Sequence, residues 1–169
     1  MDTDSLEIVL IESKDRHIIK NLYSLYLHDL SEYTNEDVSL KGLYDTKFLD
    51  LFWRKDGLIP LLIKVDSKIA GFVLLQSGQY APSTGEDYYI SQFFILREYR
   101  RKGVGKKTVK KLFNQFPGKY LVGQIPSNKP AINFWKSIYK SCRIIYEENI
   151  GYPQNTIMVF QHFKINKFR

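Results

Sequence analysis

The feature that most constrains the fold is a strand, a glycine loop and a helix in immediate succession. Residues 88–96 form a dense run of aromatic and β-branched side chains, which is typical of a buried strand. Residues 103–116 carry one apolar stripe among lysines, which predicts an amphipathic helix that ends at Pro117-Gly118. Another apolar run follows at 120–125. The sequence therefore predicts two parallel strands joined by this helix.

The remaining patterns predict an α/β (α+β) fold, with a central, mostly antiparallel mixed sheet of about seven strands flanked by about four helices. We expect the other strands at residues 6–11, 58–65, 68–75, 143–146 and 156–165. Helical spacing predicts helices at 15–30, at 39–53 as one helix or two short ones, at 103–116, and after an N-cap at Ser127 or Asn128. No repeat or linker interrupts the pattern, so we expect a single domain over 1–169.

The charge of the chain is concentrated in one short segment. Residues 97–111 contain eight basic residues and one acidic residue, so the whole formal excess of +7 lies within them. Such a cluster predicts a local anionic partner. No apolar run is long enough to span a bilayer, the acidic N-terminus does not resemble a secretory signal, and Cys142 is the single cysteine. We therefore expect a cytoplasmic protein without a membrane partner.

The loop Arg100-Arg101-Lys102-Gly103-Val104-Gly105 lies between the predicted strand and helix. A helix N-terminus offers unpaired N–H groups and partial positive charge, and glycines let a phosphate approach the backbone. The loop is neither a Walker A motif nor a dinucleotide-binding G-x-G-x-x-G motif. On the alternative interpretation, the glycines only shape a turn and the lysines form a solvated face.

The segment resembles the signature of the GNAT acetyltransferase superfamily, Arg/Gln-x-x-Gly-x-Gly/Ala after a hydrophobic strand. A second family element, Asn-x-x-Ala-x-x-aromatic, matches Asn128, Ala131 and Phe134. The resemblance covers nearly the whole chain in its order of strands and helices. It implies a GNAT-like fold, acetyl-CoA as cosubstrate and transfer of an acetyl group to a primary amine of a small molecule or a protein.

The resemblance also implies where acetyl-CoA binds. Backbone groups of Phe93 and Ile95 would pair with pantetheine amides, and Asn128 would either bond the pantetheine arm or only cap its helix. The strand and helix residues expected at the site are Phe93, Phe94, Ile95, Asn128, Ala131, Phe134 and Trp135. The expected loop residues, whose N–H groups or charges would hold the phosphates, are Arg100, Arg101, Lys102, Gly103, Val104, Gly105 and Lys106.

The catalytic residues depart from the family pattern. Trp135 occupies the position where many members have a tyrosine as general acid, so Tyr139 is the nearest hydroxyl that could replace it. Gln92 stands where a glutamate often serves as base, and it could orient water or substrate. Glu86 and Asp87 are then the candidate carboxylates, and Glu32 and Tyr33 are expected to line the acceptor cleft. The histidines have no metal-ligand spacing, and we expect no metal.

Two other functions compete with catalysis. The missing glutamate and tyrosine favour a non-catalytic acyl-CoA-binding or sensing domain. The basic cluster is also compatible with a nucleic-acid-binding module, although adjacent glycines at a helix start suit a compact phosphate group better than a long backbone. We therefore expect a small-molecule or peptide amine as partner and no nucleic acid. A homodimer is compatible with the sequence.

Overall fold

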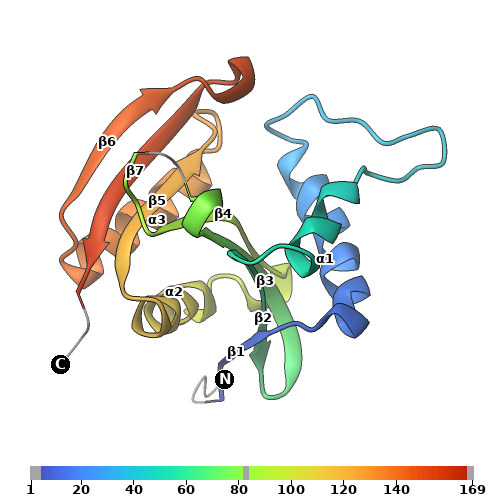
Figure 1. Cartoon of the computed structure of the whole chain (residues 1–169), viewed down its shortest axis with the longest axis horizontal. Helices are drawn as coiled ribbons and strands as arrows, with labels where there is room; N and C mark the ends of the chain where they lie inside the picture. Colours follow the sequence, from blue (N-terminus) through green and yellow to red (C-terminus); the bar gives the residue numbers. More distant parts are fainter. Residues whose placement is uncertain (1–4, 82–83, 167–169) are drawn as a thin grey trace.

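One sheet of seven strands organises the computed structural model, which describes residues 5–81 and 84–166 (Figure 1). The strands run across the sheet in the order β1-β2-β3-β4-β5-β7-β6. Five neighbouring pairs are antiparallel and β4–β5 is parallel, so the mixed sheet is as expected. The strands are β1 (Glu7–Leu10), β2 (Leu58–Val65), β3 (Lys68–Ser77), β4 (Tyr88–Ile95), β5 (Gly118–Gln124), β6 (Tyr146–Gly151) and β7 (Met158–Ile165).

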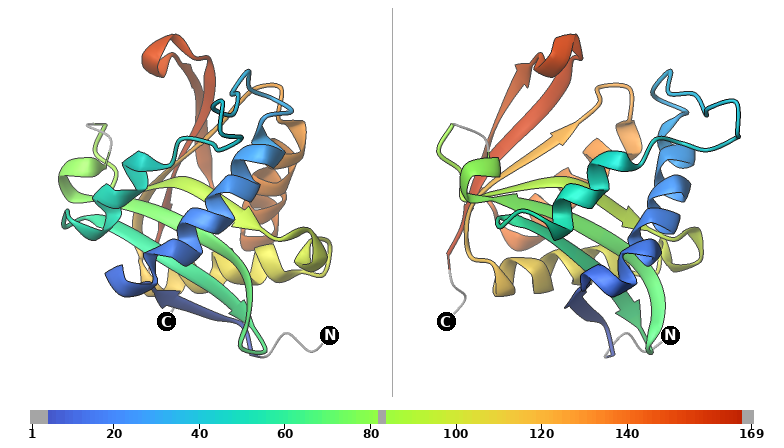
Figure 2. Two further views of the ribbon diagram at one scale, coloured as in Figure 1. Left: turned by 90° about the vertical axis from the view of Figure 1, so that its right-hand side faces the viewer. Right: turned by 45° about the vertical axis from the view of Figure 1, so that its right-hand side comes forward.

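Helices cover both faces of the sheet (Figures 1 and 2). Helix α1 (Arg16–Leu30) and the 3-10 helix η2 (Lys47–Trp53) pack on one face, and α2 (Val104–Gln115) and α3 (Lys129–Cys142) pack on the other. Two hydrophobic clusters result, one on each side of the sheet. The remaining 3-10 turns are η1 (Ser13–Asp15), η3 (Gly78–Tyr80), η4 (Arg97–Tyr99) and η5 (Pro153–Asn155). None of the described helices is long and apolar enough to cross a membrane.

Two predicted elements differ from the structure. Residues 39–46 are not helical: Leu40 and Leu43 are exposed, Gly42 has a φ of 71°, and only the 3-10 helix η2 follows. The strand expected at 143–146 is also wrong, because Arg143 adopts a left-handed conformation that ends α3 and β6 starts at Tyr146. Both segments are rich in apolar residues, but the backbone forms no regular element in either.

A bulge in β4 shapes the centre of the sheet. Leu74 of β3 lies opposite Gln92, whereas Leu75 lies opposite Ile90, so Ser91 is an extra residue on β4. The Ser91 hydroxyl donates to the Leu74 carbonyl at 3.1 Å. Strand β4 stays paired with β3 as far as Ile95, but it is paired with β5 only at residues 88–90. Because a bulge bends its strand, β4 and β5 diverge beyond this point and leave the end of β4 unpaired on one side.

Candidate functional site

The unpaired side of β4 presents backbone groups to the opening between β4 and β5. Leu96 N–H donates to the Ala70 carbonyl at 2.8 Å, which fixes the alternation of hydrogen bonds along β4. The backbone of Phe94 therefore faces β3, and that of Phe93 and Ile95 faces the opening. Since these two residues are the ones expected to pair with amides, the geometry agrees with a site for an extended, amide-bearing ligand.

The N-terminus of α2 opens at the end of the same strand. Gly103 is the N-cap, has a φ of 79° and provides no side chain to cap the helix. The N–H groups of the first turn, from Val104 to Lys106, therefore lack a side-chain cap and carry the positive end of the helix dipole. Arg101, in the turn before it, also has a positive φ, of 63°. This arrangement has the uncapped N–H groups and the left-handed turn residues that anion sites at helix N-termini share.

Gly105 is needed for a different reason from Gly103. An added Cβ at Gly103 would meet nothing within 4 Å, so the requirement there is the left-handed backbone. Gly105 is an ordinary helical residue, and an added Cβ there would lie 3.1 Å from Phe134 Cε2. Its small size thus lets α2 approach α3, a role in addition to the phosphate approach that the loop pattern predicts.

Helix α3 supplies an aromatic wall. Asn128 caps the helix, and its Oδ1 accepts a hydrogen bond from Ala131 N–H at 3.1 Å. One turn further on, Phe134 stacks on Phe93 with ring centroids 5.5 Å apart. Trp135 is 4% exposed and lies edge-on to Phe93 at 5.7 Å. These rings fix the distance between α3 and the end of β4.

Together these elements enclose a cleft of about 530 Å³. All the expected acetyl-CoA residues line it except Lys102, which is exposed on the turn, and Val104, whose side chain is buried in the core. The opposite wall comes from the end of α1 and the turn after it. Its residues are Tyr26, Asp29, Leu30, Glu32 and Tyr33, so Glu32 and Tyr33 lie in the cleft as expected.

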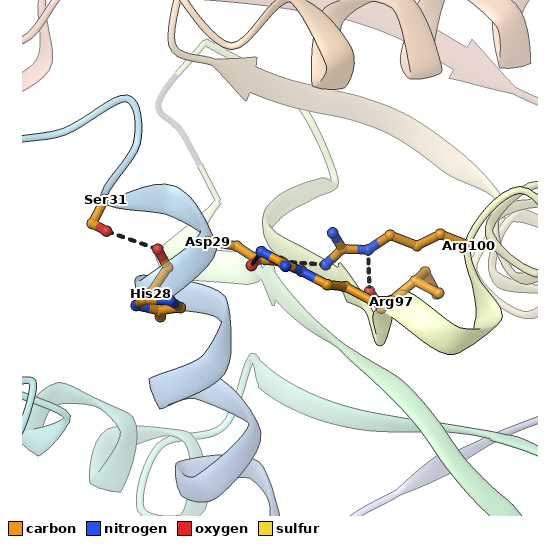
Figure 3. A network of polar contacts seen from close by, with 6 residues as sticks. His28, Asp29, Ser31, Arg97 and Arg100 are labelled. Carbon is orange, nitrogen blue, oxygen red and sulfur yellow. Dashed lines mark hydrogen bonds and ion pairs between the residues drawn. The ribbon is translucent and has the colours of Figure 1, made fainter.

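Asp29 connects the two walls of the cleft (Figure 3). Its carboxylate accepts from Arg97 at 2.6 Å and from Arg100 at 2.5 Å, and the Nε of Arg100 also donates to the Ile95 carbonyl at 2.7 Å. The Arg100 guanidinium lies 5.4 Å from the centroid of the Phe94 ring. Burial alone would raise the pKa of Asp29, but the hydrogen bonds and charges of Arg100 and Arg97 lower it below its usual value. We call these three charged residues the Asp29 clamp.

The clamp changes the role expected of two residues. Two nitrogens of the Arg100 guanidinium are held by Asp29 and Ile95, so this side chain is part of the frame of the loop. The Ile95 carbonyl is occupied too, which leaves its N–H facing the opening. Beyond the clamp, Arg101 and Lys106 are the exposed cationic residues of the loop and of the first turn of α2 that line the cleft.

The expected carboxylate bases lie elsewhere. Glu86 and Asp87 line a separate pocket of about 460 Å³ at the start of β4. Glu86 accepts from Thr84 and lies 2.6 Å from Nδ1 of His162, and Asp87 accepts from Lys119 N–H at 2.7 Å. Burial would raise the pKa of Glu86, but the hydrogen bonds from Thr84 and His162 lower it, which makes it a weaker base. Both candidates therefore line a different pocket: they precede the start of β4, whereas the cleft lies at its end.

Tyr139 and Gln92 do not line the cleft either. The Tyr139 side chain is 1% exposed, and its hydroxyl donates to Oε1 of Gln161 at 2.9 Å. Burial is the main reason that the pKa of Tyr139 is raised far above its usual value. The structure thus places Tyr139 in the core, with its hydroxyl bonded to Gln161 and away from the residues that line the cleft. The Oε1 of Gln92 accepts from Ser91 at 2.6 Å, beside the β4 bulge.

Asp29 and Tyr26 lie in the cleft although the sequence patterns did not single them out. Tyr26 packs against Phe72 and Phe94, with ring centroids 6.0 Å away in both cases. Both residues lie in the last turns of α1, and their spacing shows only that they share a helical face with Tyr33 beyond the helix end. No local signal pairs Asp29 with arginines that lie about 70 residues later in the chain.

Comparison with known proteins agrees with this geometry. Residues 19–138 match the sequence model of the acetyltransferase (GNAT) family. No curated protein matches the sequence significantly. The match ends within α3, so β6 and β7 lie outside it.

Solved structures share the fold at low sequence identity. An acetyltransferase from Thermus thermophilus superposes with a TM-score of 0.72 at 13% identity, covering 98% of this chain and 100% of that one. Spermidine N-acetyltransferase from Vibrio cholerae, in complex with CoA and spermine, gives 0.64 at 14% identity and 95% coverage of both chains. The ribosomal-protein-S18-alanine N-acetyltransferase from Escherichia coli gives 0.59 at 14% identity, with 97% and 96% covered. These likenesses establish the fold.

Because of the Asp29 clamp, we expect the free energy of unfolding to decrease as the pH falls. The carboxyl has a pKa of about 3.9 in the unfolded chain and a lower value in the folded one. Its stabilisation is therefore complete above about pH 4 and is lost as the pH falls through the folded value. In urea unfolding from pH 2 to 6, Asp29→Asn should lower the free energy of unfolding at pH 6, and its difference from the unchanged protein should shrink below pH 4.

Asp56→Asn is the matched control, because Asp56 lies exposed in a turn away from the cleft. This variant should follow the unchanged protein at every pH. If Asp29→Asn and Asp56→Asn behave alike, the clamp contributes nothing to stability.

Proposed function

The chain belongs to the acetyltransferase (GNAT) family, and from that premise we propose that it transfers an acetyl group from acetyl-CoA to a primary amine of a small molecule or a protein. One observation carries the proposal: the free edge of β4, the uncapped N-terminus of α2 and an acid-bearing end of α1 all open into one cleft. The first two suit the amide-bearing arm and the diphosphate of CoA. The third lies where an amine acceptor would enter.

The backbone and aromatic residues bind and orient the donor. The N–H groups at the start of α2, with Arg101 and Lys106, hold the diphosphate. The N–H groups of Phe93 and Ile95 and the Phe93 carbonyl face the arm that lies between β4 and β5. Phe93, Phe134 and Trp135 exclude water from that end of the cleft. When bound, the thioester supplies an acyl carbon that an amine can attack.

Glu32 is the carboxylate best placed to attract the acceptor. Of the described carboxylates, only Asp29 and Glu32 line the cleft, and Asp29 is held by two arginines. Glu32 is exposed at the mouth, where it would draw in a cationic amine and orient it towards the end of β4. An alkylammonium has a pKa of about 10, so the attacking amine must first lose a proton to solvent. Positioning of the two reactants then supplies most of the catalysis.

The function is tested by release of CoA thiol from acetyl-CoA in the presence of polyamines, aminoglycosides, amino acids and N-terminal peptides. The proposal expects amine-dependent release with at least one class, and mass spectrometry should show the acetylated product. Binding of CoA without turnover on any amine would instead support a non-catalytic acyl-CoA-binding domain.

Gly105→Val should weaken CoA binding at least tenfold. The side chain would push α2 away from Phe134, and overpacking of this kind shifts backbone by more than a phosphate site tolerates. Isothermal titration measures the effect. Asn114→Val is the control, since Asn114 is an exposed residue of the same helix that does not line the cleft. Equal CoA affinity in a folded Gly105→Val variant would exclude this loop as the phosphate site.

Glu32→Gln should raise the KM of the amine acceptor about two- to fivefold, the range of an exposed ion pair, and leave CoA affinity unchanged. The effect should decrease at high salt. Glu86→Gln is the matched control: it should leave both constants unchanged, because Glu86 lies outside the cleft and pairs with His162. A larger loss of turnover in Glu86→Gln than in Glu32→Gln would show that the acceptor enters from the pocket at the start of β4.

Tyr139→Phe should keep kcat within about twofold, and it should lower the free energy of unfolding by about 1 kcal/mol through the lost hydrogen bond to Gln161. Steady-state kinetics and urea unfolding separate the two effects. A hundredfold decrease in kcat with normal stability would restore Tyr139 as a general acid.

A further inference from the structure

Gln124, the last residue of β5, has an unexplained side chain. It is 4% exposed, and within the described residues neither Oε1 nor Nε2 of its amide has a hydrogen-bond partner. Buried amides are almost always paired, because desolvation without a replacement hydrogen bond costs free energy. An amide has both a donor and an acceptor, so the group best suited to it would itself have both.

The neighbouring buried glutamine shows what a paired side chain looks like in this core. Gln161 of β7 accepts from the Tyr139 hydroxyl and donates to Oε2 of Glu148, each at 2.9 Å. Both ends of its amide are satisfied inside the protein. Gln124 lies on the same face of the sheet, and the described part of the protein provides no such pair for it.

Gln124 does not itself line the cleft, but it lies on β5 just beyond the point where β4 and β5 diverge. The last pair between β4 and β5 joins Ile90 to Val122, so Gln124 is two residues beyond the point of divergence. Its side chain shares a face with Tyr120 and Val122, which belong to the cluster under α2 and α3. Phe93 and Trp135, which border the cleft, pack in that same cluster. Four residues later, Asn128 also lines the cleft.

We infer that the Gln124 amide hydrogen-bonds a secondary amide of the ligand arm that enters between β4 and β5. This inference rests on the proposed function, which supplies such an arm in CoA. The side-chain amide accepts from the N–H of one amide of the arm or donates to the carbonyl of another, so it contacts the arm and not the nucleotide. Gln124 is thereby a specificity-determining residue for the donor, in addition to the backbone groups of β4.

The test compares two ligands on the purified chain by isothermal titration. CoA has the arm, whereas 3′-phosphoadenosine 5′-diphosphate has only the nucleotide part. Gln124→Leu should weaken CoA about tenfold and leave the affinity of the nucleotide unchanged. Its melting temperature should equal or exceed that of the unchanged protein, because an unpaired buried amide has been removed. Gln124→Met, closer in shape to glutamine, provides a second variant and should give the same result.

Gln161→Met is the matched control, since it removes an amide that the protein itself pairs. It should lower the melting temperature and weaken neither ligand selectively. Unchanged CoA affinity in both Gln124 variants would overturn the inference and leave the proposed function intact. Equal weakening of the two ligands would also overturn it. Equal affinity of the unchanged chain for the nucleotide and CoA would overturn the inference alone, whereas binding of neither would overturn the proposed function as well.

Discussion

The extra residue in β4 is the constraint on which the site depends. Ser91 bends the strand, and its hydroxyl bond to the Leu74 carbonyl holds the bulge against β3. Without this extra residue, β4 would continue to pair with β5 beyond Ile90. The backbone groups of Phe93 and Ile95 would then form hydrogen bonds with β5 and could not bind a ligand. The cleft therefore exists because a sheet hydrogen-bond ladder is interrupted in its middle. The α2 N-terminus and the α3 aromatic wall then surround the edge that the interruption leaves open.

The parts of this site that depend on contacts within a few residues of the chain were predictable from the sequence. Arg100–Gly105 and Asn128 act through their own backbone segments: a loop that starts a helix, and a side chain that caps one. Such features depend on neighbours within a few residues, so a pattern in the chain is enough to find them. The same holds for the strand order around α2, because one short connection determines it.

The positions that the sequence did not reveal have a common physical cause, since each depends on contacts between residues far apart in the chain. Tyr139 is one helical turn from Trp135, yet its hydroxyl bonds to a buried glutamine on β7. Glu86 precedes the strand that leads to the site, yet it pairs with His162 and lines a separate pocket. Asp29 has no distinguishing sequence context, and its importance comes from two arginines on another element. A helical or strand period assigns a residue to a face but not to the partner that it meets there.

A series of hydrogen bonds and one ion pair beneath α3 determines how the strands at the edge of the sheet align. Tyr139 bonds Gln161, Gln161 bonds Glu148, and Glu148 pairs with Lys136 at 3.3 Å, so α3, β7 and β6 are joined through one buried glutamine. If β7 slipped by one residue against β5, Phe160 or His162 would replace Gln161 in this core, and the Tyr139 hydroxyl would lose its acceptor. The same slip would turn the buried side chains of Phe163 and Ile165 away from the core, so polar pairing and apolar packing specify one alignment of the last hairpin together.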